Sequence, residues 1–235
     1  SKYRNNIYDK TFISDSYSCR LNKGTHKAVK RLEKLSLKES KNYKRNFYVL
    51  KCDIKKFFDS VDHKILIDIL EKKIQDEDLL WLIKEIISSY QITKNKGIPL
   101  GNLTSQYFAN IYLNQLDQFV KHKLKIKYYI RYTDDFVILN KDKEYLENLI
   151  NPINNFLQNQ LKLCFHPDKI IIRKHNQGID FLGYVALPHY RVLRTKTKKR
   201  MFKKINPKNL PSYLGVLSHC CGYKLRKKLE NKIKP

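Results

Sequence analysis

The alternation of apolar and polar residues along the chain predicts an α+β protein. The predicted strands are apolar runs rich in β-branched and aromatic residues, and they cover 47–54, 128–132, 136–139, 161–165, 169–172 and 179–185. The predicted helices have apolar residues at helical spacing, and they cover 63–74, 78–90, 142–161 and the stretches that follow Thr25 and Gln106. This order of elements favours a split βαβ antiparallel sheet backed by helices on one face.

Trp81 and the aliphatic stripes of the helices 63–74 and 78–90 are expected to lie in the core. Pro152 interrupts the apolar period of the helix 142–161. A kink or a break is expected there, because proline cannot donate the helical hydrogen bond. A small helical tail with apolar Tyr213, Leu217 and Leu229 is expected after residue 204.

The chain is strongly basic, with 48 Lys and Arg against 22 Asp and Glu and a formal charge of +26. Such an excess repels itself unless a polyanion is bound, so nucleic acid is the expected partner. Codon usage in an AT-rich genome is an alternative source of the lysines. Five cysteines without a C-x-x-C pair indicate reduced thiols rather than disulfides or a zinc site.

No apolar run approaches the roughly 20 residues that span a bilayer, and no signal peptide precedes the first charges. A cytoplasmic protein without a membrane partner is therefore expected. The sequence begins without Met and without a core element, so an N-terminal piece is expected to be missing.

Three carboxylates stand next to predicted strands. Asp134 and Asp135 lie at the tip of a predicted hairpin, and Asp53 ends the apolar run 47–54. The pair alone could be an ordinary solvated turn, but an acid at the end of a buried strand needs a cation or a hydrogen-bond cage. Three such acids can hold two Mg²⁺ ions for phosphoryl transfer on nucleic acid, in a polymerase or in a nuclease.

Other polar stretches are candidate binding elements. The glycines of the loop 96–106 precede a helix, where backbone N–H groups can approach a phosphate or a base. Arg20 and Lys23 are either phosphate ligands or solvated loop cations. A basic cluster, where a duplex could lie, comprises Arg191, Arg194, Lys196, Lys198, Lys199 and Arg200.

The sequence Tyr132-Thr133-Asp134-Asp135 matches the Y-x-D-D box of reverse transcriptases, and the chain resembles that family over nearly its whole length. The stretch 53–61 resembles the box with the first metal-binding Asp, and 181–184 resembles the primer-grip turn. The resemblance implies a right-hand polymerase that copies RNA into DNA. Its expected parts are partial fingers at 1–50, a palm at 51–193 with inserted fingers helices at about 63–105, and a basic connector with the start of a short helical thumb at 194–235.

The resemblance also implies roles for individual residues. Two Mg²⁺ ions would be held by Asp53, Asp134, Asp135 and the backbone carbonyl of Ile54. The incoming dNTP would contact Arg20, Lys23, Phe57, Phe58, Leu100, Gly101, Gln106 and Lys169. Phe58 falls where the family keeps an aromatic residue that blocks the ribose 2′-hydroxyl, although a core aromatic is the alternative. The primer strand would contact Tyr132, Phe181, Leu182, Gly183 and Tyr184.

Within the family, Leu100-Gly101 and Ser105-Gln106 replace the Gln-Gly and Ser-Pro that are usual in group II intron and retron enzymes. These residues are similar to reverse transcriptases of diversity-generating retroelements. That subgroup implies a prokaryotic or phage protein that copies a template RNA into cDNA with errors at adenine, together with a small basic accessory variability protein. The alternatives are an antiphage reverse transcriptase of the abortive-infection or unclassified kind, and a nucleic-acid-binding relative without catalysis.

Overall fold

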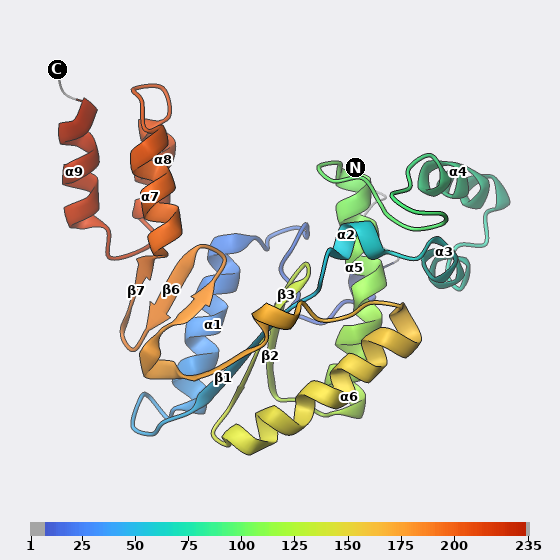
Figure 1. Cartoon of the computed structure of the whole chain (residues 1–235), viewed down its shortest axis with the longest axis horizontal. Helices are drawn as coiled ribbons and strands as arrows, with labels where there is room; N and C mark the ends of the chain where they lie inside the picture. The colour runs from blue at the N-terminus through green and yellow to red at the C-terminus, as the bar shows by residue number, and fades with distance from the viewer. Residues whose placement is uncertain (1–7, 234–235) are drawn as a thin grey trace.

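A four-stranded antiparallel sheet forms the centre of the computed structural model, which describes residues 8–233 (Figure 1). The strand order is β2-β3-β1-β4. The strands are β1 (Tyr48–Asp53), β2 (Tyr128–Tyr132), β3 (Asp135–Asn140) and β4 (Ile171–Lys174). The predicted α+β class and antiparallel sheet are confirmed.

The register of β1 and β3 brings the two ends with acidic residues together. Tyr48 lies opposite Asn140 at one end of the pair, and Asp53 lies opposite Asp135 at the other. β2 and β3 form the expected hairpin, in which Tyr132 also lies opposite Asp135. All three predicted acids therefore lie at the same end of the central strands. We call this end of the sheet the acidic edge.

Helices cover both faces of this sheet. α5 (Leu103–Gln118) and α6 (Lys143–Leu161) join the core on the face of Leu50 and Phe136. α1 (Thr25–Glu39) packs on the opposite face, that of Val49 and Val137. The expectation that helices back the sheet on one face only was therefore wrong. α6 runs on past Pro152, so the predicted break does not occur.

Three helices separate β1 from α5: α2 (Phe57–Ser60), α3 (His63–Glu71) and α4 (Glu77–Ser88). The side chain of Asp62 starts α3 by accepting a hydrogen bond from the Ile65 N–H at 3.1 Å. The expectation that the stripe of α4 is core was wrong, since Trp81 is 64% exposed and only Ile87 is buried in this helix. α4 packs mainly on α3, and four of its apolar side chains stay exposed, namely Leu79, Trp81, Leu82 and Ile86.

A second, three-stranded antiparallel sheet follows β4. Its strands are β5 (Ile179–Phe181), β6 (Tyr184–Leu187) and β7 (Tyr190–Leu193). The predicted strand 179–185 is thus two strands, joined by a turn in which Leu182 and Gly183 have φ angles of 51° and 86°. The predicted strand at 161–165 was wrong: Leu161 ends α6, and only Phe165 makes an isolated bridge, to Ile54.

The C-terminal helices α7 (Thr195–Lys204), α8 (Leu210–Leu217) and α9 (Tyr223–Ile233) lie at one end of the long axis, and α3 and α4 lie at the other (Figure 1). The remaining helical turns are short, at Asp9–Thr11, Phe119–Lys123, Pro167–Lys169 and His175–Gln177. Within residues 8–233, no helix has the length and apolar content that crossing a membrane requires.

Candidate active site

The acidic edge of the central sheet carries the three predicted carboxylates. Asp53 ends β1 directly opposite Asp135, the first residue of β3. Asp134 lies one residue earlier, at the tip of the β2–β3 hairpin. The side chains of Asp53 and Asp135 are 19% and 18% exposed, so they are accessible from the cleft without being fully solvated.

Burial perturbs the ionisation of the hairpin acids. It raises the pKa of Asp134, and the neighbouring charge of Asp53 adds to this effect. Burial also raises the pKa of Asp135 to about 6, with the ammonium of Lys51 acting in the opposite direction. Carboxylates with raised pKa values in a cleft are typical of functional sites.

Two lysines lie against these acids. The Nζ of Lys169 lies 3.0 Å from Asp53 Oδ1, which places a predicted nucleotide ligand at the acidic edge. The Nζ of Lys51 lies 3.1 Å from Asp135 Oδ2 and donates to the carbonyl of Asp180 at 2.8 Å. Lys51 was not predicted, although strand alternation puts it on the same face as Asp53, two residues later.

The donor set fits a divalent cation that prefers oxygen ligands. One oxygen of Asp135, Oδ1, is buried and has no hydrogen-bond partner in the described part of the chain. No group of three His, Cys, Asp or Glu side chains within residues 8–233 is close enough to form a ready-made metal site. In this structure the Asp53 and Asp135 carboxylates instead pair with Lys169 and Lys51.

A cavity of about 250 Å³ opens beside the acids. Its charged lining residues are Lys51, Asp53, Asp135, Lys169, Arg173, Asp180 and Arg194. Four of these seven side chains are cationic, so the cavity suits an anionic ligand that also brings cations for the carboxylates.

The predicted basic cluster falls into two groups. Arg191 pairs with Glu33 at 3.4 Å, and Arg194 Nε donates to Asp180 Oδ1 at 2.6 Å. The other four lie on α7 and form no ion pair with an acid of residues 8–233. They are Lys196, Lys198, Lys199 and Arg200. These four are the members of the cluster that are available to phosphates.

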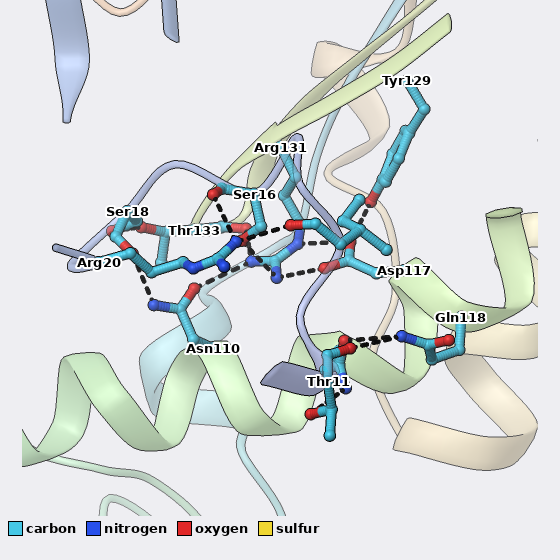
Figure 2. Close-up of polar contacts among 12 residues, drawn as sticks. Thr11, Ser16, Ser18, Arg20, Asn110, Asp117, Gln118, Tyr129, Arg131 and Thr133 are labelled. Atoms are coloured by element: carbon cyan, nitrogen blue, oxygen red, sulfur yellow. Dashed lines mark hydrogen bonds and ion pairs between the residues drawn. The ribbon is translucent and has the colours of Figure 1, made fainter. Parts of the chain in front are cut away.

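Figure 2 shows a buried polar cluster behind the hairpin that the sequence analysis missed. Its centre is Arg131 of β2, whose fully buried guanidinium pairs with the equally buried Asp117 of α5 at 2.6 Å. Arg131 also donates to the carbonyl of Thr133, next to Asp134, at 3.0 Å. A charged residue inside an apolar strand was the signal that could have indicated it.

Residues 2–186 match the family described as "Reverse transcriptase (RNA-dependent DNA polymerase)". This chain belongs to the reverse transcriptase family. Group II intron-encoded protein LtrA of Lactococcus lactis subsp. cremoris is 27% identical over 84% of this chain and 42% of LtrA. Protein YkfC of Escherichia coli (strain K12) is 26% identical over 76% of this chain and 56% of that protein. The chain thus spans about half the length of these relatives.

Solved structures share the fold of this reverse transcriptase chain. Apo telomerase from Candida tropicalis, truncated from its C-terminal domain, has a TM-score of 0.63 at 15% identity, covering 82% of this chain and 44% of that one. Telomerase from Candida albicans, solved with a fragment of telomeric RNA, has a TM-score of 0.59 at 13% identity, covering 81% and 36%. These likenesses confirm the predicted reverse transcriptase fold.

The aromatic residues and the loop residues that are predicted to contact the incoming dNTP lie in different surroundings in this reverse transcriptase chain. Phe57 is 2% exposed and packs edge-on against Phe58 and Tyr112, so its ring is part of the core. Phe58 is half-buried beside it. In the loop before α5, Leu100 is 70% exposed and Gly101 has a φ of 93°.

The predicted cations and amide of the nucleotide site are largely occupied by protein contacts. Arg20 donates to Asp9 Oδ1 at 2.7 Å and to the carbonyls of Ile13 and Ser16. Lys23 donates to the carbonyl of Ser14 at 2.6 Å. Gln106 accepts a hydrogen bond from the Cys19 thiol at 2.9 Å. Only Lys169 among the predicted nucleotide ligands contacts a predicted metal-binding acid.

The predicted primer residues lie on β2 and on the turn between β5 and β6. Tyr132 accepts a hydrogen bond from Thr25 Oγ1 at 3.3 Å. Phe181 and Tyr184 are buried, and Tyr184 donates to the Val216 carbonyl at 3.2 Å. Leu182 and Gly183 form the left-handed turn between these two aromatic residues and are both partly exposed.

Proposed function

We propose that this chain is the catalytic part of an RNA-directed DNA polymerase that works with two Mg²⁺ ions. The observation that carries the proposal is the direct pairing of Asp53 with Asp135 next to Asp134, beside a cavity whose seven charged lining side chains include four cations. Membership of the reverse transcriptase family supports it. The net charge of +26 fits a chain that binds nucleic acid.

Asp53, Asp134, Asp135 and the backbone carbonyl of Ile54 are the proposed metal ligands. Bound Mg²⁺ would neutralise phosphate charge and activate the attacking hydroxyl of the primer. Asp134 and Asp135 must be ionised for this role, against the raised pKa values that burial gives them. The unpartnered Oδ1 of Asp135 is an oxygen available for it.

The substrates would bind on either side of these acids. Lys169, half exposed beside Asp53, would contact the phosphates of the incoming dNTP once a metal takes over the carboxylate. The turn Leu182-Gly183 would hold the end of the primer strand. The unpaired cations of α7 would contact the phosphates of the duplex between template RNA and cDNA.

The polymerase parts can be assigned to the elements on this basis. Residues 1–50 would belong to the fingers and 51–193 to the palm, with α3 and α4 as inserted fingers helices. Residues 194–235 would form the basic connector and the start of the thumb. The telomerase solved with telomeric RNA shows that a protein of this fold binds RNA, which supports a template RNA as the partner.

Extension of a DNA primer on an RNA template, followed by product sequencing, tests the proposal. We expect Mg²⁺-dependent dNTP incorporation by the wild-type chain. Asp134→Asn should abolish incorporation and retain RNA binding, because the substitution removes a metal ligand and not a phosphate contact. Unchanged incorporation by Asp134→Asn would contradict the assignment of Asp134 as a metal ligand. Cleavage of the template without extension would instead indicate a nuclease, and binding alone a non-catalytic relative.

We further propose that the enzyme belongs to a diversity-generating retroelement and is error-prone at adenine. Leu100 carries this proposal, since its exposed aliphatic side chain stands where related enzymes have a glutamine amide. The amide could restrain the incoming nucleotide through hydrogen bonds that leucine cannot make. Leu100→Gln should lower adenine misincorporation in the sequenced products, and an unchanged error spectrum would contradict the idea.

The wider setting follows from the same proposal. The enzyme would work in the cytoplasm of a prokaryote, together with a small basic accessory protein. A template and variable repeat pair beside the gene would support diversification. Their absence, with defence genes as neighbours, would favour the antiphage alternative.

A further inference from the structure

Arg131 is a fully buried cation whose five N–H donors are all used. Nε and one terminal nitrogen bind the two oxygens of Asp117 at 2.7 and 2.6 Å. The same terminal nitrogen reaches Ser16 Oγ at 3.2 Å. The other donates to the carbonyl of Thr133 at 3.0 Å and to Asn110 Oδ1 at 3.4 Å. Only the planar fork of arginine can serve this many acceptors from one position.

Stability alone does not explain this pair. The desolvation of two charges offsets most of their attraction, so a buried ion pair is on average no more stabilising than well-packed apolar residues. Arg131 and Asp117 are both completely inaccessible to solvent. Asp117 also accepts a hydrogen bond from the Tyr129 hydroxyl at 2.8 Å. What this arrangement provides beyond stability is a fixed geometry for the groups around it.

The group it fixes is the residue before Asp134. Thr133 has a φ of 52°, a left-handed conformation that is strained for a β-branched residue and that persists only where the surroundings hold it. Two contacts do so: Arg131 binds the Thr133 carbonyl, and Thr133 Oγ1 donates to Ser18 Oγ at 2.8 Å. The backbone at 133 sets the direction of the Asp134 side chain.

The cluster also reaches the loop before α1 and the start of α5. The Arg131 N–H donates to the Asp15 carbonyl, and Asn110 Nδ2 donates to the Ser18 carbonyl at 2.7 Å. Next to Ser18, the Cys19 thiol donates to Gln106, one helical turn before Asn110. Figure 2 shows Ser18 of the N-terminal loop and Asn110 and Asp117 of α5 converging on the space around Arg131 of β2.

We propose that Arg131, Asp117, Thr133 and Ser18 are positioning residues that hold the left-handed turn before Asp134 and thereby aim this carboxylate into the active site. The inference rests on the proposed polymerase function. None of the four residues needs to touch the substrate. The loop 15–19 serves as the outer support of the turn, so its displacement would loosen Asp134.

Thr133→Val tests the support from Ser18, because valine keeps the shape of threonine and lacks the hydroxyl. We expect kcat for dNTP incorporation to fall about tenfold, the factor that one lost hydrogen bond can produce. KM for the dNTP, the affinity for primer and template, and the melting temperature should stay near wild type. Thr11→Val is the matched control, since its hydroxyl donates at 2.7 Å to the Tyr8 carbonyl, away from the hairpin (Figure 2).

The second variant replaces the buried charges together as Arg131→Met, Asp117→Leu and Tyr129→Phe. No buried charge or Tyr129 hydroxyl is then left unpaired, while Ser16 Oγ, Asn110 Oδ1 and the Thr133 carbonyl each lose one donor. The protein is therefore expected to fold with reduced stability. Its kcat should fall about a hundredfold, as misplacement of a catalytic group by about 1 Å can cause. A folded triple variant with wild-type kcat would overturn the proposal. If the triple variant does not fold, the result for Thr133→Val decides whether the proposal holds.

A readout independent of activity separates this proposal from the proposed function. Hydrogen exchange at residues 133–135 should accelerate in Thr133→Val and remain unchanged in Thr11→Val. If the wild-type chain extends no primer, the proposed function fails, and the exchange result still decides the positioning role. Unchanged exchange at 133–135 in Thr133→Val would overturn the positioning role whatever the activity.

Discussion

The ammonium of Lys51 lies 3.1 Å from Asp135 Oδ2 and only 2.8 Å from the Asp180 carbonyl. It therefore joins the acidic edge of the central sheet to β5 of the second sheet, and it holds one oxygen of Asp135 while the other stays free of hydrogen bonds within the described residues. Lys51 also opposes the rise in the pKa of Asp135 that burial causes.

Lys51→Met is expected to move the pH dependence of incorporation. Asp135 has a pKa of about 6 with Lys51 present, and loss of the ammonium raises it further. A carboxylate that must be ionised then becomes active only at higher pH, so the acidic limb of the pH–rate profile shifts upward. Single-turnover rates between about pH 5.5 and 8.5 measure this shift.

The control for Lys51→Met is Lys162→Met, because Lys162 pairs with a different carboxylate, Asp62, at 3.0 Å. Its profile should match wild type. Lys51→Arg keeps the positive charge, so the acidic limb of its pH–rate profile should lie close to that of wild type. Superimposable profiles of Lys51→Met and wild type would show that Lys51 does not influence Asp135.

Asp135→Asn is expected to stabilise the metal-free protein at neutral pH. The folded-state pKa of about 6 lies above the usual value of about 3.9, so the folded state holds the proton more tightly. Ionisation of Asp135 therefore costs stability as the pH rises through 6, and an uncharged asparagine avoids that cost. We expect about 3 kcal/mol at pH 7.5, an advantage that disappears near pH 4.

Thermal melts in EDTA across this pH range measure the effect of Asp135→Asn. EDTA matters because a bound divalent cation would stabilise the ionised carboxylate. A difference in melting temperature between variant and wild type that does not change with pH would exclude a buried carboxyl group with a raised pKa at this position.

Lys169→Met is expected to weaken dNTP binding without destabilising the fold. The side chain is 50% exposed, and exposed ion pairs contribute about 0–1 kcal/mol to stability. Loss of a charged hydrogen bond to phosphate should raise KM for the dNTP about tenfold or more. Lys143→Met, which breaks the exposed pair with Glu147, is the control and should leave KM unchanged. An unchanged KM in Lys169→Met would place the triphosphate elsewhere.

Replacement of Lys198, Lys199 and Arg200 by Gln is expected to reduce the salt dependence of nucleic-acid binding. Each lost contact with a duplex phosphate lowers the slope of log K against log salt by about 0.9. Fluorescence anisotropy with a primer–template duplex at several salt concentrations measures the slope.

The control for the α7 variant replaces Lys123, Lys125 and Lys141 by Gln. These exposed lysines lie near the end of β2 and β3 opposite the acids, and their loss removes the same charge. Equal slopes for both triple variants would mean that only net charge matters and that α7 is not a docking surface.

The periodicity of the sequence determined most of the central elements, because their apolar residues repeat at the spacing of one buried face. β1, the β2–β3 hairpin and α6 all appear where alternation or helical spacing predicts them. The convergence of Asp53 with Asp134 and Asp135 was also predictable, since Asp53 ends an apolar strand and the other two lie at the tip of an apolar hairpin. Their direct register, Asp53 opposite Asp135, was not.

Periodicity failed where an element lacks the neighbour that its pattern seems to require. α4 has the apolar spacing of a core helix, yet Trp81 and Leu82 are 64% and 49% exposed, because α3 is the main element that packs against it within residues 8–233. The run 161–165 has strand-like residues, but the end of α6 takes its first residue and only Phe165 finds a pairing partner. Burial depends on what the rest of the chain brings, and local spacing does not contain that information.

The sequence by itself determined the α+β class, the basic character and the three acids, since residue type and spacing are sufficient for these. The tertiary structure decided which cations contact the three predicted acids and which pair with other carboxylates of the chain. Arg20 and Arg194 were expected to contact nucleotide and nucleic acid, and both pair with carboxylates of the chain. Arg131 looked like one residue of a strand and became the centre of the support behind Asp134. The partners of a charged side chain come from distant segments, so only the folded chain specifies them.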